Sequence, residues 1–244
     1  MEILERSLIK TSLIIGACLI IGVAIVSYTM YQVRAADNSL SVTGSAKQTV
    51  TSDLAKWSGS FSRTVYATSL NDGYTQMKKD ENVVSKFFKD NGVVDSELTI
   101  SPVSMQKVYS YDKNGNQGPD QYTLVQNVSI QSTDINKIST LSKNIQPIIE
   151  SGVIFSAYSP EYYYTKLPDV RISLLPDAMK DAQKRAESIV QSTGRKVGSV
   201  QSASMGVVQV LQPNSTDISD YGNYDTSTIE KDVMITVKAA FSVR

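Results

Sequence analysis

The sequence TSLIIGACLIIGVAIVSYTMYQV occupies residues 11–33, contains no charged side chain, and decides how the rest of the chain is organised. At about 1.5 Å per residue, a helix over this run would be roughly 35 Å long, which exceeds the ~30 Å hydrocarbon core of a bilayer. Lys10 and Arg34 flank the run, and Tyr28 and Tyr31 lie near one end, where interfacial aromatic residues are common. The run therefore predicts a membrane-spanning helix in front of a large second domain.

The apolar run allows two further interpretations of the N-terminus. A secretory signal peptide is one, since cleavage between Ala35 and Ala36 would be tolerable, but its apolar core is shorter, at about 7–15 residues. A lipidated cysteine is the other, because small residues precede Cys18. Residues 19–26 remain apolar, however, where a lipoprotein turns polar. The length of the run favours an uncleaved anchor.

The charges around the run predict its orientation. Arg6 and Lys10 precede it, and positive charge favours the cytoplasmic side. We expect residues 1–34 to form a cytoplasmic stub and transmembrane anchor, and residues 35–244 to form one exported domain. Cys18 is the single cysteine, which suits a bacterial envelope better than a disulfide-stapled secreted domain. The expected location is the bacterial cytoplasmic (inner) membrane, with a single pass and the C-terminal domain in the periplasm or outside the cell.

The exported domain has nearly balanced charge. The whole sequence has 24 basic and 24 acidic residues. Before residue 35 lie three basic residues, Arg6, Lys10 and Arg34, and two acidic ones, Glu2 and Glu5, so the exported domain has 21 basic and 22 acidic residues. No basic field is left to attract nucleic acid. The sequence also has no histidine, which removes the usual general base near neutral pH and histidine-ligated zinc. We expect no catalytic site, no cofactor, no metal site and no nucleic-acid partner.

Residue periodicity predicts an α+β fold of antiparallel sheets with helices packed on one face, in the order ββα-ββα-β-α-ββ. Pro147 should kink or split one helix, because proline has no N–H to donate. Alanines at one-turn spacing should let another helix lie close to a sheet. The predicted elements are a long β-hairpin over 39–66, a helix over 69–91, a hairpin with arms near 98–111 and 122–132, a helix between 134 and 152, a strand over 153–166, an alanine-rich helix over 174–194, and strands over 197–212 and 229–243 joined by a mobile loop.

Two polar segments are candidate cation sites. Asp112, Asn114 and Asn116 match the beginning of a calcium-binding EF-hand loop, but the glycine and glutamate required later in that loop are absent. A hairpin turn at Asn114 is the preferred interpretation. Three aspartates in the loop 213–228 could share a cation, although a solvated acidic loop is preferred. The sequence does not indicate whether this loop binds anything.

Three consecutive tyrosines end the predicted strand 153–166. Successive strand side chains point to opposite faces, so Tyr162 and Tyr164 should share one face and Tyr163 should occupy the other. Tyrosine is enriched at protein interfaces. All three are therefore candidate residues of an oligomer interface, with ordinary core packing plus one rim tyrosine as the alternative.

Short motifs of small residues mark three segments of the exported domain. The first, LSVTGSAKQTVTSDLAKWSGSF, contains V-x-G, whose glycine is Gly44, and then V-x-x-D-x-A, whose aspartate is Asp53. The second, NGVVDSELTISPVSMQKVY, begins at a G-[IV] step with Gly92. Its Ser101 stands at a position where this motif usually has threonine.

The third segment, LLPDAMKDAQKRAESIVQSTGRKVGSVQSASMG, carries an A-x-x-[DN]-A-x-x-[RK]-A helix with Ala182 and Ala186, then G-x-x-[IVL]-G with Gly194 and Gly198. Together the three segments resemble the SIMPL domain family of bacterial envelope proteins, across about 39–244. The resemblance implies an α+β fold, export, and self-assembly into rings or cages in some members. It implies no catalytic site. The matching glycines and alanines suit tight turns and close helix–sheet contact.

These observations predict a non-enzymatic, single-pass, membrane-anchored envelope protein. Its exported domain is expected to self-assemble into a ring- or cage-like homo-oligomer that acts as a structural scaffold. The alternative is a monomeric envelope sensor or small-ligand-binding module linked to stress, and an enzyme based on carboxylates and tyrosines is a third class. The expected partners are the membrane and further copies of the chain, and the sequence identifies no other envelope protein.

Overall fold

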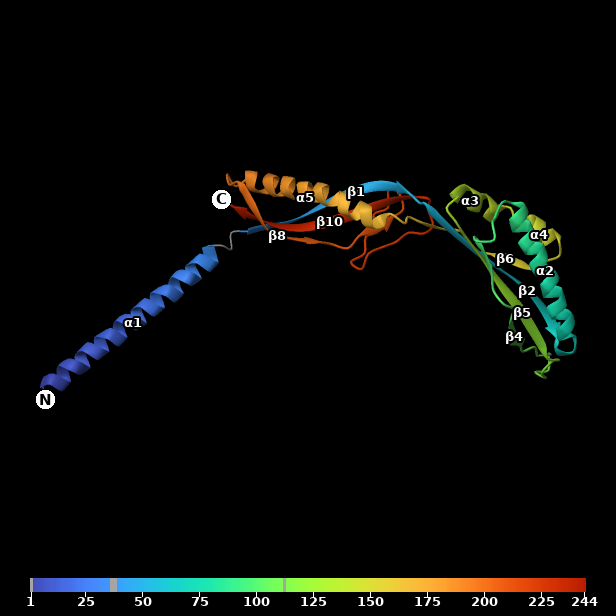
Figure 1. Ribbon diagram of the computed structural model, residues 1–244, viewed down its shortest axis with the longest axis horizontal. Coiled ribbons are helices and arrows are strands. Elements are labelled where there is room, and N and C mark those ends of the chain that lie inside the picture. The colour runs from blue at the N-terminus through green and yellow to red at the C-terminus, as the bar shows by residue number, and fades with distance from the viewer. Residues whose placement is uncertain (1, 36–38, 112) are drawn as a thin grey trace. The chain divides into compact units, whose positions relative to one another are not determined.

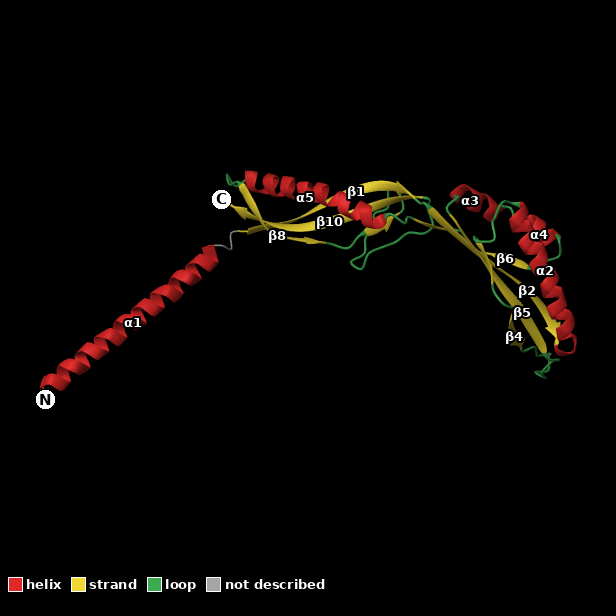
Figure 2. Cartoon of the chain, in the orientation of Figure 1, coloured by secondary structure: helices red, strands yellow, loops and turns green. Residues whose placement is uncertain are grey.

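The computed structural model describes residues 2–35, 39–111 and 113–244, and within them it contains five α-helices and two β-sheets (Figure 1). Figure 2 shows helices and antiparallel strands combined in the same chain, so the predicted α+β class is confirmed. Packing divides the chain into two compact units. Unit 1 comprises the described residues within Met1–Ala46, Leu174–Val207 and Ile235–Arg244, and unit 2 comprises those within Lys47–Ser173 and Val208–Met234.

The first helix, α1 (Glu2–Ala35), contains the apolar run. Its segment Ile14–Gln32 has a mean hydropathy of 2.1, and the rest of the protein buries none of it. These 19 residues would measure about 28 Å, close to the hydrocarbon thickness of a bilayer. The protein therefore has an N-terminal apolar helix that could span a membrane, as the sequence predicts.

The first sheet has the strand order β1–β10–β8, and β9 also pairs with β10. In unit 1, β10 and β8 are antiparallel, with irregular register near the end of β10; in unit 2, β10 and β9 are antiparallel. The alanine-rich helix that packs on this sheet is α5. The bounds are β1 (Ser39–Thr51), β8 (Val197–Met205), β9 (Gln209–Leu211), β10 (Glu230–Val243) and α5 (Leu167–Gln191).

Small residues bring α5 close to the sheet in unit 1. Ala182 and Ala186 are fully buried in a cluster with Phe241 of β10. Gly44 of β1 lies so close to the helix that an added Cβ would overlap backbone atoms of Ala178 and Ala182. Backbone therefore packs on backbone here, which confirms that the alanines allow close helix–sheet packing.

Unit 2 contains a six-stranded antiparallel sheet in the order β3–β5–β2–β6, with β4 pairing on β5 and β7 on β2. Strand β2 is central because β5 pairs with it over Ala55–Tyr66 and because β6 and β7 also pair with it. The second predicted hairpin is confirmed by the pairing of β3 and β4 with β5. The bounds are β2 (Leu54–Tyr66), β3 (Leu98–Ile100), β4 (Ser104–Val108), β5 (Gln121–Ser132), β6 (Phe155–Ala157) and β7 (Glu161–Tyr163).

Three helices cover one face of this sheet: α2 (Leu70–Asp90), α3 (Ile135–Lys143) and α4 (Gln146–Glu150). Pro147 lies in the first turn of α4, so the predicted split of this helix at the proline is confirmed. The core beneath the helices includes Trp57, Phe61, Met77, Val84, Phe88, Leu124, Val128, Ile130, Ile138 and Ile148.

The prediction of a long hairpin over 39–66 is wrong. Strand β1 pairs with β10, whereas β2 pairs with β5, β6 and β7 in the other sheet. The chain leaves one sheet and enters the other at Ser52 and Asp53, whose N–H groups donate to the carbonyl oxygens of Ile229 and Tyr163, both at 2.9 Å. Alternation identified each strand correctly, but alternation carries no information about which strand is the partner.

Three element boundaries also differ from the prediction. The strand expected over 153–166 is divided into β6 and β7, and the strand expected over 197–212 is divided into β8 and β9. Helix α5 begins at Leu167 and contains Pro176, because its apolar positions continue the helical spacing on both sides of the proline. Within α5, Val190 is buried whereas Ile189 is 49% exposed.

We predict that Ala182→Leu lowers the free energy of unfolding by about 1–3 kcal/mol, because the larger side chain overpacks the contact with β1. Gly44→Ala should be at least as destabilising, since backbone atoms cannot rotate away from the new methyl group. Gln183→Leu, at an exposed position on the same helix, is the control and should be nearly neutral. Urea unfolding of the detergent-solubilised protein measures all three. Equal losses for Ala182→Leu and Gln183→Leu would contradict the close contact.

Candidate functional site

The three candidate tyrosines differ in their exposure. Tyr162 is buried in the core of unit 2, with 7% of its surface exposed, and it is therefore unavailable to a partner. Tyr163 and Tyr164 are half-buried. Tyr164 follows the end of β7, so the alternation of a strand does not fix its direction. Only Tyr163 and Tyr164 contribute aromatic surface.

Tyr163 is held by aromatic and charged neighbours. Its ring centroid lies 6.0 Å from that of Tyr224. The Lys56 ammonium lies 5.0 Å from the Tyr163 ring centroid, within the range of a cation–π interaction. The Tyr163 hydroxyl donates to Glu161 at 2.8 Å, and this hydrogen bond raises the pKa of Tyr163. Tyr163 therefore presents an ordered surface.

Asp53 anchors the chain that follows β7. Its carboxylate accepts hydrogen bonds from the N–H and hydroxyl of Thr165, at 2.7 and 2.8 Å. The N–H of Tyr164 donates to the hydroxyl of Tyr224 at 3.0 Å, which connects the same segment to the loop 213–228. Asp53, which matches the family motif, thus has a structural role: its hydrogen bonds close the turn between the two sheets.

A buried lysine fixes the other end of the loop 213–228. Lys231 of β10 is fully buried, and its Nζ donates to the carbonyl oxygens of Asp225 and Thr228 at 2.7 and 2.6 Å. The Asp225 carboxylate lies 3.3 Å from the same Nζ. Burial lowers the pKa of Lys231, and the Asp225 charge opposes that shift. The loop is therefore attached to the sheet through a buried ion pair.

Asp225 has little capacity left for a cation. Its carboxylate accepts from the hydroxyls of Thr228 and Ser227 at 2.5 and 2.7 Å. Burial raises the pKa of Asp225, but these hydrogen bonds outweigh burial and hold the pKa well below its usual range. The carboxylate is thus committed to the loop itself. Within the described residues, no group of three or more acidic, histidine or cysteine side chains is arranged to hold a metal ion.

The other candidate cation loop falls partly outside the described residues, because Asp112 lies there. The described part has turn geometry, with a φ of 81° at Gly115 and a bridge between Tyr111 and Gln117. This geometry supports the preferred hairpin-turn interpretation at Asn114.

The remaining family-like positions also have structural surroundings. Gly92 and Gly194 follow α2 and α5 with φ values of 80° and 73°, a conformation that favours glycine at a helix end. Gly198 lies against β10, where an added Cβ would meet the hydroxyl of Ser242. With Gly44, Ala182 and Ala186 in the helix–sheet contact, these positions shape the fold and carry no reactive group.

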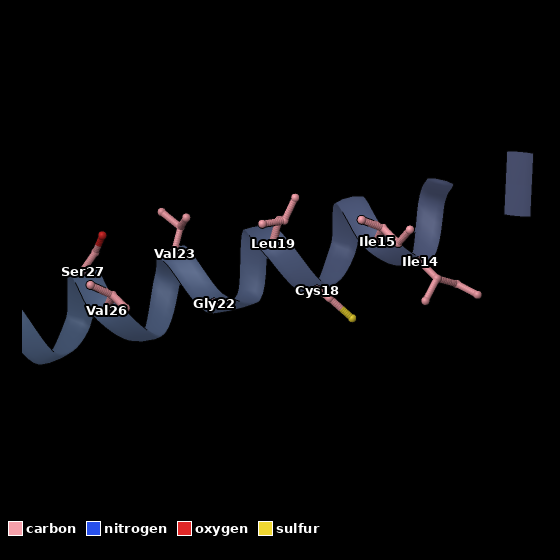
Figure 3. A pocket seen from close by; sticks show the side chains of 8 residues that line it. All are labelled: Ile14, Ile15, Cys18, Leu19, Gly22, Val23, Val26 and Ser27. Atoms are coloured by element: carbon pink, nitrogen blue, oxygen red, sulfur yellow. The ribbon is translucent and has the colours of Figure 1, made fainter. Parts of the chain in front are cut away.

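An apolar groove runs along α1 beside Gly22 (Figure 3). All of its walls come from one helix, so it cannot enclose a soluble ligand. The surface instead suits lipid tails or another apolar helix. The lining residues are Ile14, Ile15, Cys18, Leu19, Gly22, Val23, Val26 and Ser27.

A polar cleft of about 660 Å³ lies at the sheet of unit 2. Its two carboxylates are already engaged: Glu97 bonds Lys137 at 2.7 Å, and Glu161 bonds Tyr163. Sequence reasoning missed this cleft, although alternating serines in β2 were its visible signal. The lining residues are Lys56, Trp57, Ser58, Ser96, Glu97, Thr99, Ser129, Ile130, Gln131, Tyr158, Ser159 and Glu161.

The fold and its surfaces define a class: an α+β domain that follows an apolar helix able to span a membrane. The chain belongs to the SIMPL family, because the model of that family, described as a protein of unknown function (DUF541), matches residues 40–241. The match confirms the resemblance drawn from the three sequence segments. Comparison with curated proteins finds no match.

We predict that acid destabilises the protein through carboxylates whose pKa is lowered in the fold, among them Asp225 and Asp232. Such groups contribute stability that is present above their unfolded pKa and lost as pH falls through the folded pKa. The free energy of unfolding should be flat near neutral pH, since no histidine titrates there, and should decline below about pH 5.

Asp225→Asn should lower stability at neutral pH and make the acid decline shallower. Asp217→Asn, at an exposed position in the same loop, should leave the profile unchanged. Denaturant titrations from pH 3 to pH 9 give both curves. Parallel declines in the wild type and Asp225→Asn would refute the role assigned to Asp225.

Proposed function

We propose that this chain is a non-enzymatic, single-pass, membrane-anchored protein of the bacterial envelope, whose exported domain assembles into a ring- or cage-like homo-oligomer that serves as a scaffold. The observation that carries the proposal is α1. It is an exposed 19-residue apolar segment at the N-terminal end of a SIMPL family chain. A function tied to a membrane surface follows from that helix.

The flanking charges support an orientation for the anchor. Arg6 and Lys10 on its N-terminal side favour a cytoplasmic N-terminus, which places the domain in the periplasm or outside the cell. The helix extends unbroken to Ala35, past the length of a signal-peptide core, and this supports retention of the anchor in the inner membrane.

Assembly is supported by an open sheet edge in unit 1. Strand β8 ends the sheet order and carries no charged residue in VGSVQSASM, whereas charge is a common protection of edge strands. On the opposite edge, the Ser45 N–H of β1 donates to Asp181 of α5 at 2.8 Å, so one of the outward donors of that strand is already bonded. An open edge offers backbone hydrogen bonds to another copy, and ring closure would satisfy every such interface.

The proposal of a non-enzymatic role is supported by the hydrogen bonds and ion pairs that already occupy the acidic side chains. Glu97, Glu161 and Asp225 are each bonded to a partner within unit 2. With no histidine in the sequence, the chain lacks the usual general base near neutral pH. The polar cleft favours the second candidate function, a monomeric envelope sensor or small-ligand-binding module, and the oligomeric mass separates the two.

We predict that protease added to intact spheroplasts digests the domain from residue 39 onward, because it lies outside the cytoplasmic membrane. An N-terminal fragment containing Ile14–Gln32 should stay in the membrane fraction. N-terminal sequencing and immunoblotting provide the readout. Protection of the domain until lysis, or a mature chain that begins after α1, would overturn the anchor.

We predict that the detergent-solubilised chain has the mass of an oligomer in light scattering. The edge can be tested with proline. Gly206 donates inward to Thr236, so by alternation Ser204 also faces inward and Ala203 faces outward. Ala203→Pro should lower the oligomer mass with little loss of stability, because proline removes only an outward donor.

Ser204→Pro is the matched comparison and should destabilise the fold, because it breaks the ladder with β10. Tyr163→Glu and Tyr164→Glu test the tyrosine surface in the same assay. A monomer in the wild type would reject the scaffold in favour of the sensor. An oligomer unchanged by Ala203→Pro would place the interface elsewhere.

A further inference from the structure

The face of the six-stranded sheet opposite α2, α3 and α4 carries a surface of uncharged hydroxyl and amide groups. Strand alternation places every second residue of β2 and β5 on this face. The register pairs Ser58 with Ser129, Ser60 with Asn127, and Thr64 with Thr123. We name this surface the hydroxyl face. Its members are Ser58, Ser60, Ser62, Thr64, Thr99, Ser104, Gln106, Thr123, Val125, Asn127, Ser129 and Ser156.

The hydroxyl face departs from an ordinary solvent-exposed sheet surface. None of the twelve members is charged, and the charged residues Lys56 and Glu161 pair with each other at one end of the same face. Among the described residues, the hydroxyls of Ser58, Ser60 and Ser129 have no protein hydrogen-bond partner, and Thr99 and Asn127 are exposed beside them. A row of available donors and acceptors therefore crosses three strands, β3, β5 and β2.

One end of the hydroxyl face deepens into the polar cleft of about 660 Å³. Tyr158 contributes an exposed ring there, with 61% of its surface accessible. The buried Trp57 fixes the segment that carries this ring, because its Nε1 donates to the Tyr158 carbonyl oxygen at 2.8 Å. Lys56 lies on the same wall, with its ammonium over Tyr163. The cleft thus combines unpartnered hydroxyls and one exposed aromatic ring with three charged side chains, each of which contacts a neighbour within the protein.

This chemistry discriminates among classes of ligand. A nucleic acid or phosphorylated ligand would need a basic surface, which the hydroxyl face lacks. A second protein copy is disfavoured because serine is depleted at protein interfaces. An apolar small molecule would need a mostly apolar pocket. An uncharged sugar chain fits, since its ring hydroxyls can bond to groups repeated about every 4.8 Å across strands and about 7 Å along them.

We propose that the hydroxyl face and its cleft bind an extended, uncharged polysaccharide chain, with sugar hydroxyls bonding to Ser58, Ser60 and Ser129 and one sugar ring stacking on Tyr158. The inference rests on unit 2 alone, and it stands whether the full protein is a monomer or an oligomer.

The test is calorimetric titration of the full chain, solubilised in a detergent without a sugar headgroup. The probes are a hexamer of N-acetylglucosamine, maltohexaose and, as the charged comparison, an oligogalacturonate. We expect saturable binding of at least one neutral oligomer. It should change little between low and about 0.5 M salt, because no charge is neutralised. The acidic oligomer should bind at least tenfold more weakly.

Ser60→Glu and Ser129→Glu should each weaken neutral-oligomer binding at least tenfold, because each places an unpaired charge in the middle of the hydroxyl face. Asn82→Glu, at an exposed position of α2, adds the same charge elsewhere and should bind like the wild type. Tyr158→Ala, which removes only the exposed ring, is the second variant if a glutamate reduces folding, and it too should weaken binding.

Absence of saturable binding to either neutral oligomer would overturn the proposal. Equal binding by the wild type, Ser129→Glu and Tyr158→Ala would overturn it as well, as would preferential binding of the acidic oligomer. Light scattering of the same samples separates this outcome from the scaffold proposal. If Ser129→Glu lowers the oligomer mass, the hydroxyl face is a contact between copies, and the polysaccharide assignment is wrong.

Discussion

The contact between β1 and α5 in unit 1 is the constraint on which the packing of that unit depends. Gly44 has no room for a side chain against the backbone of Ala178 and Ala182, so helix and strand are closer than larger residues allow. The same approach lets the Ser45 N–H reach Asp181, which bonds one donor on the β1 edge to the helix. Packing and this edge contact thus come from the same approach of helix and strand.

Local chemistry made part of this fold predictable from sequence. The uncharged run, the alanine spacing and Pro147 each act through neighbours within a few residues, and α1, α5 and the division between α3 and α4 lie near where they were expected. Strand pairing was not predictable in the same way. Period-two alternation is identical whether β1 pairs with β2 or with β10, and the choice is made by contacts distant in sequence, such as Ser52 with Ile229.

The candidate sites likewise include features that the sequence predicts and features that only the fold reveals. Consecutive tyrosines stand out in the sequence, but only the fold shows that Tyr162 is core while Tyr163 is held between Lys56 and Tyr224. The buried ion pair of Lys231 and Asp225 had no sequence signal, because a lysine next to a strand aspartate looks solvent-exposed. The hydroxyl face did leave a signal, the alternating serines of β2, whose meaning depends on the serines and threonines that β5 places opposite.

The distribution of charge connects these features. The described ion pairs fix helices, turns and the loop 213–228 within their own units, as Asp80 with Arg63 and Asp225 with Lys231 illustrate. The Ile14–Gln32 segment of α1, the β8 strand and the twelve members of the hydroxyl face by contrast carry no charged side chain. Removing a charged surface from water is costly, whereas an uncharged surface can be covered at much lower cost. The three uncharged surfaces differ in chemistry, being apolar, backbone-rich and hydroxyl-rich. We therefore propose a different class of neighbour for each: lipid, another strand, and a neutral polar chain.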